Sequence, residues 1–330
     1  MDEVENKAVI ATKWSLLGQV FSKLVTPITT LILAHLLTPE VFGVVATVTM
    51  VTSFAEMFSD AGFQKYIVQH EFSNETELKE AGDVAFWSNM ALSLCFLALI
   101  FLFSDHIAVA VGCAGYGLAL TIAGMSIPLV AACSVPTAIF QRTFDYKTLF
   151  GARVGSAIAI LLVSVPIAYF GGQHWSLIVG TVCSNVFLTV WLFWLSDWKP
   201  RLRYSYRVLR EMFAFSSWTL LEAIALWITG WVGTFICAMY LNSYYLGLYK
   251  TSVSLVSSVT GIATSAVNPI IFATLSRFQF DKDRFTSLVY SMQSLLAFAC
   301  VPVAASLFVF RDAIVGLYLG EQWLEAATFM

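Results

Sequence analysis

The chain consists of long apolar stretches separated by short polar segments. Several stretches are almost free of charge: Leu24–Ala34, Val84–Phe103, Ile158–Phe170, Leu177–Leu195 and Leu288–Phe310. A helix needs about 20 apolar residues to cross a bilayer, where it satisfies its own backbone hydrogen bonds. The pattern predicts a polytopic all-α transmembrane helical bundle with spans at roughly 13–36, 41–66, 83–104, 118–140, 148–170, 174–196, 212–241, 244–275 and 285–310.

The composition indicates the same environment. Hydrophobic residues make up 58% of the chain and charged residues 12%, and the mean hydropathy is +0.78. A soluble protein carries about 25% charged residues, so most of this surface is expected to face lipid. No small-residue cleavage site follows the apolar run that begins near Lys13, so we predict a retained span. The dispersed cysteines contain no CxxC pair, so neither a disulfide framework nor a metal site is expected.

The basic residues indicate the orientation of the spans. Most of the eighteen Lys and Arg residues fall at the N-terminus or in the connections after spans 2, 4, 6 and 8: Lys7, Lys13, Lys65, Lys79, Arg142, Lys147, Arg153, Lys199, Arg201, Arg203, Arg207, Arg210, Arg277, Lys282 and Arg284. The opposite connections contain only Arg311, whereas Lys23 and Lys250 lie inside spans. Because cytoplasmic loops are enriched in Lys and Arg, the N-terminus is predicted to be cytoplasmic.

The sequence contains an internal repeat. A shift of 204 residues aligns identical residues at Trp14 and Trp218, Leu16 and Leu220, Leu17 and Leu221, Thr30 and Thr234, Ile32 and Ile236, Ala34 and Ala238, Leu37 and Leu241, Gly43 and Gly247, Thr47 and Thr251, and Ser53 and Ser257. Spans 1–3 map onto spans 7–9, and an offset of six spans preserves their orientation. Parallel repeats of this kind are a transporter architecture, with the substrate site between two lobes.

The repeat predicts two pseudo-symmetric six-helix lobes. Residues 1–200 are expected to form the first lobe, and residues 201–330 the first three helices of the second lobe. The shift also predicts a tenth span starting near Gln322, so the second lobe is expected to be truncated in this chain.

Several motifs resemble those of the polysaccharide flippases. They are Lys13-Trp14-Ser15, Leu33-Ala34-His35-Leu36-Leu37-Thr38-Pro39-Glu40-Val41-Phe42-Gly43, Phe58-Ser59-Asp60-Ala61-Gly62-Phe63, Arg142-Thr143-Phe144-Asp145-Tyr146, Leu246-Gly247-Leu248-Tyr249, Leu275-Ser276-Arg277 and Gly320-Glu321-Gln322-Trp323. The Leu-Thr-Pro-Glu-x-Phe-Gly turn is the most specific of them. Over nearly all of its length, the chain resembles the Wzx-type, colanic-acid-exporter-like branch of the multidrug/oligosaccharidyl-lipid/polysaccharide exporter superfamily.

The resemblance implies a multi-pass protein of the bacterial cytoplasmic (inner) membrane, with a cavity between its lobes. Such a protein moves a lipid-linked oligosaccharide, typically on undecaprenyl diphosphate, by alternating access for surface polysaccharide biosynthesis. Its expected partners are this substrate, the lipid bilayer and glycan polymerase machinery, and no nucleic acid, cofactor or catalytic residue is expected. Two positions depart from the family pattern: His35 replaces the usual arginine, and Gly233 replaces an aspartate that many members have.

Ionisable groups inside spans are costly and are therefore candidates for a functional site. Lys23 lies ten residues into span 1, which is about 15 Å at the helical rise. Lys250 lies two turns into span 8, and both lysines are predicted contacts of an anionic head group that has lost its hydration. Glu222 lies about as deep in span 7 and is predicted to pair with Lys23 or to accept a proton or sodium ion. Gln19, one turn before Lys23, is a candidate sugar contact.

Structural roles are alternatives for these residues. A membrane lysine can extend its charge to the interface, Glu222 can link the lobes, and Gln19 can belong to the packed core. The segment Gly151-Ala152-Arg153-Val154-Gly155 has GxxxG spacing, for which close helix packing is the favoured interpretation.

Two other functions suit a polytopic helical protein. A cation-coupled multidrug antiporter of the same superfamily would favour acidic cavity residues, which the two buried lysines oppose. A membrane-bound glycan polymerase, ligase or acyltransferase would need catalytic His, Asp or Arg groups, usually on a large periplasmic loop. The histidines are dispersed, the connection near 105–117 is small, and the sequence has no P-loop for ATP. A transporter rather than an enzyme is therefore the first prediction.

Overall fold

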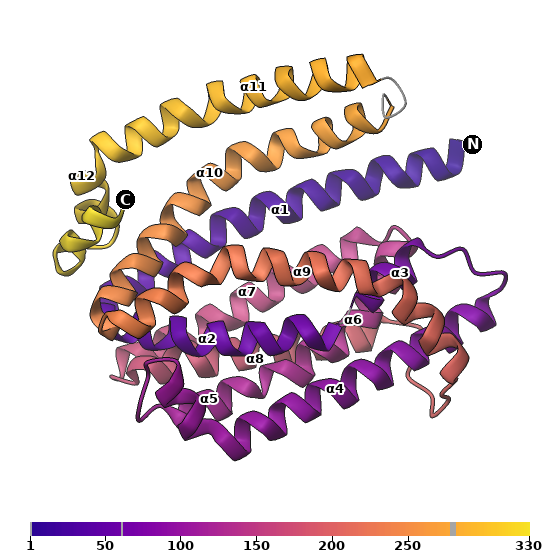
Figure 1. The fold of residues 1–330 in the computed structure, drawn as a ribbon, viewed down its shortest axis with the longest axis horizontal. Helices are drawn as coiled ribbons and strands as arrows, with labels where there is room; N and C mark the ends of the chain where they lie inside the picture. The colour runs from indigo at the N-terminus through magenta and orange to yellow at the C-terminus, as the bar shows by residue number, and fades with distance from the viewer. Residues whose placement is uncertain (1, 61, 278–281) are drawn as a thin grey trace.

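The computed structural model describes the backbone of residues 2–60, 62–277 and 282–330 (Figure 1). Side chains are described for residues 10–22, 24, 25, 27–59, 62–261, 284–298 and 300–330. Every element in this part of the chain is helical, in the order α1 (Asp2–Leu36), α2 (Pro39–Asp60), α3 (Phe63–Gln69), α4 (Glu75–Ala110), α5 (Gly117–Gly124), α6 (Ser126–Arg142), α7 (Tyr146–Tyr169), α8 (Gln173–Leu195), α9 (Tyr206–Tyr240), α10 (Ser243–Arg277), α11 (Lys282–Val309), α12 (Arg311–Tyr318) and the 3₁₀ helix η1 (Glu321–Phe329). The predicted all-α fold is confirmed.

The predicted spans correspond to these helices. Within the described residues, eight segments are long and apolar enough to cross a membrane, and each overlaps one predicted span. The remaining predicted span, 244–275, is helical as part of α10. The chain is therefore a multi-pass membrane protein, as the apolar stretches predicted. The tenth span expected near Gln322 stays a prediction, because the described residues there form η1.

Two spans that the hydropathy pattern predicts as continuous are interrupted in the structure. Residues 41–66 are divided between α2 and α3, and Gly62 precedes α3 with a φ of 80°. Glycine adopts this left-handed conformation without a Cβ penalty, so it provides the break. Residues 118–140 are divided between α5 and α6 at Met125. Apolar residues continue across the break at Met125, which is why the pattern did not reveal it.

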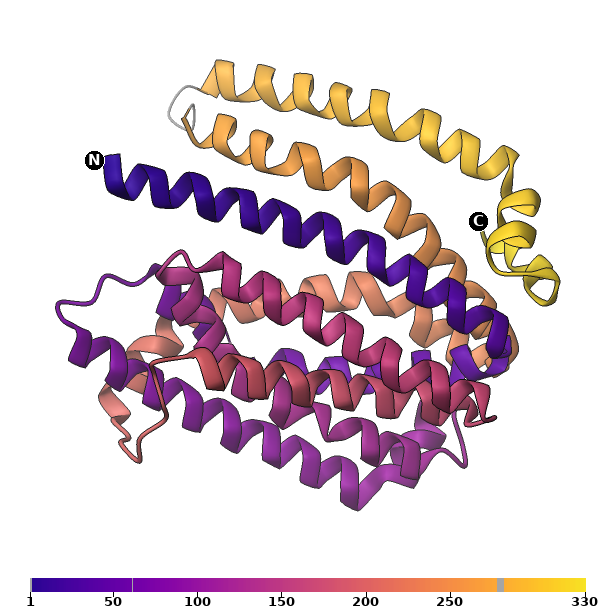
Figure 2. The same cartoon turned by 180° about the vertical axis from the view of Figure 1, so that it is seen from behind.

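The long helices run roughly alongside one another, so the bundle has two ends (Figure 1 and Figure 2). One end carries the short turns between α1 and α2, α7 and α8, and α9 and α10, and we call it the turn end. The other carries α3 and the connection between α8 and α9, and we call it the linker end. We call α1–α8 the first half and α9–η1 the second half. Helix α1 packs along α7, α10 crosses α2, and α11 lies beyond α10.

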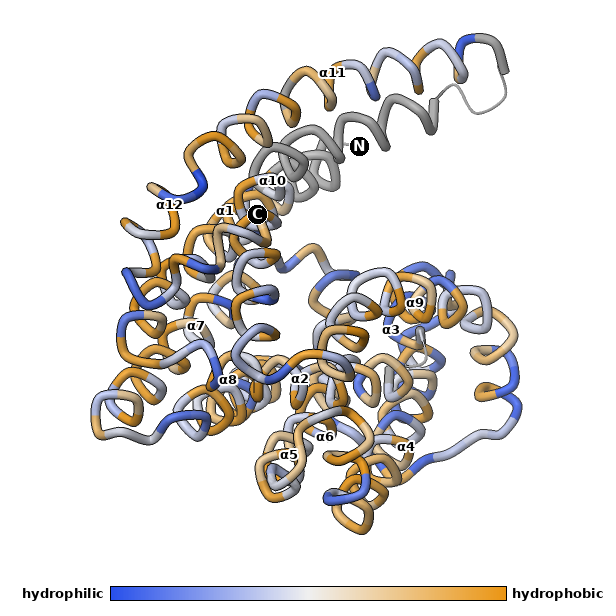
Figure 3. Tube along the Cα trace, turned by 60° about the vertical axis from the view of Figure 1, so that its left-hand side comes forward, coloured by the Kyte–Doolittle hydropathy of each residue, from blue (hydrophilic) through white to orange (hydrophobic). Residues whose placement is uncertain are grey.

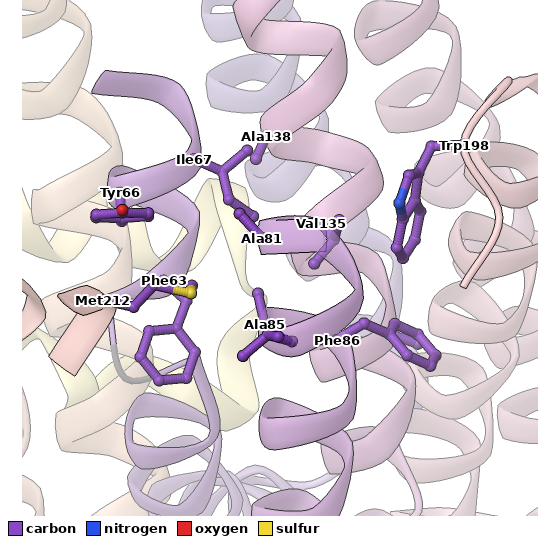
Figure 4. Packing of buried hydrophobic residues seen from close by; sticks show 12 residues of the cluster. Phe63, Tyr66, Ile67, Ala81, Ala85, Phe86, Val135, Ala138, Trp198 and Met212 are labelled. Carbon is purple, nitrogen blue, oxygen red and sulfur yellow. The ribbon is translucent and has the colours of Figure 1, made fainter. Parts of the chain in front are cut away.

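The linker end contains a buried apolar cluster that joins α3, α4 and α6 (Figure 4). Phe63, Ala85 and Val135 represent the three helices in it, and Trp198 enters from the connection between the halves. Met212 at the start of α9 completes the cluster. The segment after α8 is thus part of the apolar core of the first half.

Hydrogen bonds hold the same connection against α4. The backbone N–H of Arg201 donates to Asp83 Oδ1 over 3.0 Å, and Trp87 Nε1 donates to the carbonyl oxygen of Arg201 over 2.8 Å. Asp83 and Trp87 lie one turn apart on the helix, so together they fix the direction of the connection. This docking is consistent with a boundary near residue 200, which itself stays a prediction.

The crossing of α2 and α10 contains the same contact twice. A Cβ on Gly43 would collide with the carbonyl oxygen of Ser243, and a Cβ on Gly247 would collide with the carbonyl oxygen of Pro39. Gly247 follows Gly43 by 204 positions, and Ser243 follows Pro39 by 204 positions. A twofold axis produces reciprocal contacts of this kind. The repeat detected in the sequence therefore has a direct geometric counterpart.

The outside of the bundle is apolar. Figure 3 shows apolar positions along α4, α5 and α7. Leu102, Leu162, Phe170, Trp194 and Trp218 are each more than two-thirds exposed. Monomeric soluble proteins rarely expose extended apolar patches, whereas such side chains are stable against lipid tails.

Candidate functional site

Three cavities in the described part of the structure share Thr30 of α1. The Lys250 cavity has a volume of about 200 Å³ and is lined by Thr30, Phe42, Val45, Ala46, Thr49, Leu177, Trp231, Lys250, Thr251 and Ser254. The Arg153 cavity, about 300 Å³, is lined by Phe21, Ser22, Val25, Thr29, Thr30, Leu33, Phe42, Arg153, Ser156, Ala157, Ile160, Leu177 and Ser184. The apolar cavity, about 250 Å³, is lined by Pro27, Thr30, Ser254, Leu255, Ser258, Val259, Leu307, Ile314 and Tyr318.

Lys250 supplies the charge of the first cavity. Its Nζ lies 3.7 Å from the centroid of the Trp231 ring and donates a hydrogen bond of 3.4 Å to Thr234 Oγ1. A cation over an aromatic face is stabilised more strongly when it is partly desolvated, as this half-buried lysine is. Neither contact neutralises the ammonium, and Lys250 forms no ion pair with another residue whose side chain is described.

The short connection between α9 and α10 places Lys250 there. Asn242 Oδ1 accepts a hydrogen bond of 3.1 Å from the N–H of Tyr245 and so caps the first turn of α10. The second turn of α10 then faces the end of α9. Trp231 and Thr234 lie three residues apart, on one face of α9, so both reach Lys250.

The opposite wall of the Lys250 cavity comes from α2. Ala46 lines this wall and is the repeat counterpart of Lys250, since the two positions are 204 apart. Thr30 in the lining is likewise the counterpart of Thr234, the hydrogen-bond partner of Lys250. Equivalent positions of both halves therefore meet around this cavity, but only the second half contributes a charge.

Arg153 supplies the charge of the second cavity. It lies on α7, and a Cβ on Gly18 of α1 would be 3.4 Å from its guanidinium. Ser184 Oγ donates to the Ser156 carbonyl oxygen over 2.9 Å, and Ser156 Oγ donates to the Arg153 carbonyl oxygen over 3.0 Å. The guanidinium of Arg153 can bind an anion, and the two serine hydroxyls in the same lining, whose protons go to backbone carbonyls, can still accept hydrogen bonds from a hydroxylated ligand.

The two charged cavities are adjacent, because Thr30, Phe42 and Leu177 line both. No described residue in the three linings is a carboxylate, a histidine or a cysteine. Across the described chain, no group of His, Cys, Asp and Glu residues is arranged to hold a metal ion. Cations and hydroxyl groups of this kind suit the binding of an anion or a polyol.

The structure brings only one predicted site residue into these cavities among those whose side chains it describes. Lys250 lines a cavity, whereas Gln19 lines none of the three. Glu222, predicted to pair with Lys23, instead has Lys65 of α3 as its described partner, with Nζ 2.7 Å from Oε2. The side chain of Lys23 lies outside the described residues.

Two contributors to the site were missed by the sequence interpretation. Arg153 was counted among the residues that set orientation, although its position inside the predicted span 148–170 was a signal of burial cost. Trp231 carried no comparable signal, because its role depends on the α9–α10 turn that places it under Lys250.

Sequence comparison identifies related proteins. The family described as "Polysaccharide biosynthesis protein" matches residues 32–328. The chain is 25% identical over 320 residues to the succinoglycan biosynthesis transport protein ExoT of Rhizobium meliloti (strain 1021), covering 95% of this chain and 63% of that protein. It is 22% identical over 331 residues to the lipopolysaccharide biosynthesis protein WzxC of Escherichia coli (strain K12), covering 97% and 65%. The chain thus spans less than two thirds of the length of these two relatives.

The fold is also shared with a solved structure. The inward-facing conformation of a multidrug resistance MATE family transporter of the MOP superfamily superimposes with a TM-score of 0.68, over 94% of this chain and 79% of that one. The sequences are 13% identical, so the likeness establishes the helical architecture alone.

Proposed function

The chain belongs to the polysaccharide biosynthesis protein family, and from this premise we propose that it acts in a flippase for a lipid-linked oligosaccharide. In this proposal the oligosaccharide is carried on undecaprenyl diphosphate and crosses the membrane by alternating access, for surface polysaccharide biosynthesis. The relatives named for succinoglycan transport and lipopolysaccharide biosynthesis support this substrate class. Glycan polymerase machinery is the partner that would receive the product.

The observation that carries the proposal is the position of Lys250. Its ammonium faces a cavity between the halves, and no described carboxylate pairs with it. An anionic head group that leaves water needs such a charge to replace its hydration. Trp231 beside it offers an aromatic face, and Arg153 in the adjacent cavity adds a second cation. Cationic linings in which the described residues include no carboxylate argue against an antiporter for cationic drugs.

The other predicted residues take different places in the proposal. We keep Lys23 as a head-group contact, because it lies one turn before Pro27 on the helix that lines all three cavities. Gln19 is retained as a sugar contact. Glu222 fits a link between the halves better than a coupling site, since Lys65 of the first half occupies its carboxylate.

We place the linker end in the cytoplasm of a bacterium and the turn end outside its inner membrane. The clustering of basic residues supports this orientation: Lys65, Lys79, Arg201, Arg203 and Arg207 all lie in or beside the connections of the linker end.

The test is to replace Lys250 in the full-length protein and to measure glycan export in cells. Lys250→Ala is expected to reduce export at least tenfold, whereas Lys250→Arg should retain much of it, because the charge remains. Lys79→Ala is the matched control, because Lys79 pairs with Glu75 at the surface and lines none of the three cavities. Wild-type export by Lys250→Ala, at equal protein abundance, would reject the proposed site.

A further inference from the structure

The end of α1 at the turn end leaves backbone carbonyl groups without partners in its own helix. The last four carbonyls of any helix lack such partners, and α1 ends at Leu36. Pro39, three residues after Leu36, has no N–H to donate to these carbonyls. Ala34 is fully buried, so its carbonyl oxygen needs a donor from elsewhere in the protein.

The second half provides the missing donors. Gln322 Nε2 donates to the carbonyl oxygens of Ala34 over 2.7 Å and Leu37 over 3.3 Å, and Trp323 Nε1 donates to the same Ala34 oxygen over 2.9 Å. Trp323 is fully buried, with the Phe42 ring edge-on at 5.1 Å. We call this contact the Ala34 clasp. It joins η1 of the second half to α1 and α2 of the first.

A second bond lies beside it. The hydroxyl of Tyr318 donates to the carbonyl oxygen of Pro27, again from the second half to α1. Burial raises the pKa of Tyr318, so the hydroxyl keeps the proton that it donates. The segment α12–η1 therefore contacts α1 at two levels, on both sides of Thr30.

The repeat counterpart of Ala34 is also covered by the opposite half. Ala238 lies 204 positions after Ala34, at the end of α9. A Cβ on Gly112 of the first half would collide with the Ala238 carbonyl oxygen. We call this contact the Ala238 clasp. Each half thus places the connection after its third span on the first helix of the other half.

We propose that the two clasps form the gate that closes the turn end of the cavities, and that Gln322 and Trp323 set how firmly it closes. This inference rests on the proposed alternating access, in which the halves separate at the turn end. Ala34 lies one helical turn beyond Thr30, which lines all three cavities, so the clasp sits directly above them. Opening toward that side requires the carbonyl of Ala34 to exchange its two side-chain donors for water.

The test measures access to the cavities in the full-length protein. Ser254 lines two of the cavities, and a Ser254→Cys variant without other cysteines reports their exposure to a membrane-impermeant maleimide applied from outside the cell. The double variant Gln322→Leu/Trp323→Phe keeps the bulk of both side chains and removes both donors. Labelling of the cysteine is expected to become about tenfold faster, because the closed state loses buried hydrogen bonds.

The matched control is Trp175→Phe. Trp175 is a half-buried indole at the same end, and it packs within the first half. The Trp175→Phe substitution should therefore leave the labelling rate of the cysteine at position 254 unchanged. An unchanged rate in the double variant, or an equal increase in the control, would overturn the gate. If the double variant does not fold, as judged by its thermal unfolding in detergent, the labelling rate is measured in Gln322→Leu alone. A faster rate then supports the gate, and an unchanged rate overturns it.

This result is separable from the proposed function. Faster labelling together with normal export by Lys250→Ala would support the gate and reject the substrate site. Unchanged labelling in the double variant, together with loss of export by Lys250→Ala, would reject the gate and support the substrate site.

Discussion

The Ala34 and Ala238 clasps occupy equivalent positions of the repeat and use different chemistry. At Ala34, the side chains of Gln322 and Trp323 donate hydrogen bonds to the carbonyl oxygen. At Ala238, the backbone of Gly112 approaches the carbonyl oxygen directly, in a conformation with a φ of 80°. The repeat has therefore kept the places where the halves touch, while the interactions at those places have diverged.

The difference has a physical consequence. A side-chain donor can rotate away and be replaced by water, so the strength of the Ala34 clasp depends on residue identity. A contact made by the absence of a Cβ has no such freedom, so the Ala238 clasp depends on glycine alone. Four predictions test this contrast, from the largest expected loss of stability to the smallest.

The largest effect is expected at the symmetric crossing of α2 and α10. Gly43→Ala and Gly247→Ala each place a methyl group against a backbone carbonyl that can move only if the helices separate. Each should destabilise the protein by about 3 kcal/mol or more, to a similar extent, as thermal unfolding in detergent would show. Gly230→Ala is the control: Gly230 lies in α9 with open space around it, so this substitution should not lower the free energy of unfolding. Clearly unequal losses at Gly43 and Gly247 would contradict the symmetry of the crossing.

The Ala238 clasp can be separated from simple backbone strain. Gly112 and Gly115 both have a positive φ, but only Gly112 has an atom of the other half in the way. Gly115→Ala should therefore cost about 1 kcal/mol from strain, and Gly112→Ala about 2–3 kcal/mol from strain and collision. The measurement is the difference between their unfolding temperatures, and equal temperatures would mean that the clasp contributes no stability.

The hydroxyl of Tyr318 should have a smaller effect. Tyr318→Phe removes its hydrogen bond to Pro27 while keeping the ring, at a cost of about 1 kcal/mol. Tyr290→Phe, on an exposed face of α11, is the control and should be neutral. Comparison of the two unfolding temperatures tests whether α12 stabilises α1, and a neutral Tyr318→Phe would show that the bond to Pro27 contributes no stability beside the Ala34 clasp.

The smallest effect is expected at the linker end. Lys65 and Glu222 join the halves there through an ion pair in which both side chains are at least half exposed. Solvent screens such a pair, so Glu222→Gln should cost about 0.5 kcal/mol at low salt and less at high salt. Unfolding temperatures at two salt concentrations provide the measurement. A loss as large as that of Gly112→Ala would show that the two ends do not differ as proposed.

Much of the fold was predictable because its signals are local. Apolar stretches of sufficient length locate the helices, and the identity of Gly43 and Gly247 under the 204-residue shift indicates the repeat, although it does not predict their contact. The break before α3 did not follow from the length of the apolar stretch alone, because it depends on the left-handed backbone conformation of Gly62.

The site was predictable in part. Lys250 was found because a charge inside an apolar span is rare. The role of Gln322 and Trp323 was not found, although their motif was noticed, since their partner on α1 is almost the whole chain away. Lys65, the described partner of Glu222, was not predicted because α3, which carries it, packs against α9 only after the break at Gly62.

The packing of the connection after α8 against the first half has a consequence for the order in which the protein folds during translation. Eleven of the twelve buried residues in the cluster that holds Trp198 precede residue 200, and Met212 is the exception. A ribosome therefore releases almost the whole of this cluster before it releases the helices of the second half, and nascent domains fold in that order. Packing of Trp198 then completes the apolar cluster of the first half at an early stage. The helices of the second half would insert against a first half that is already folded.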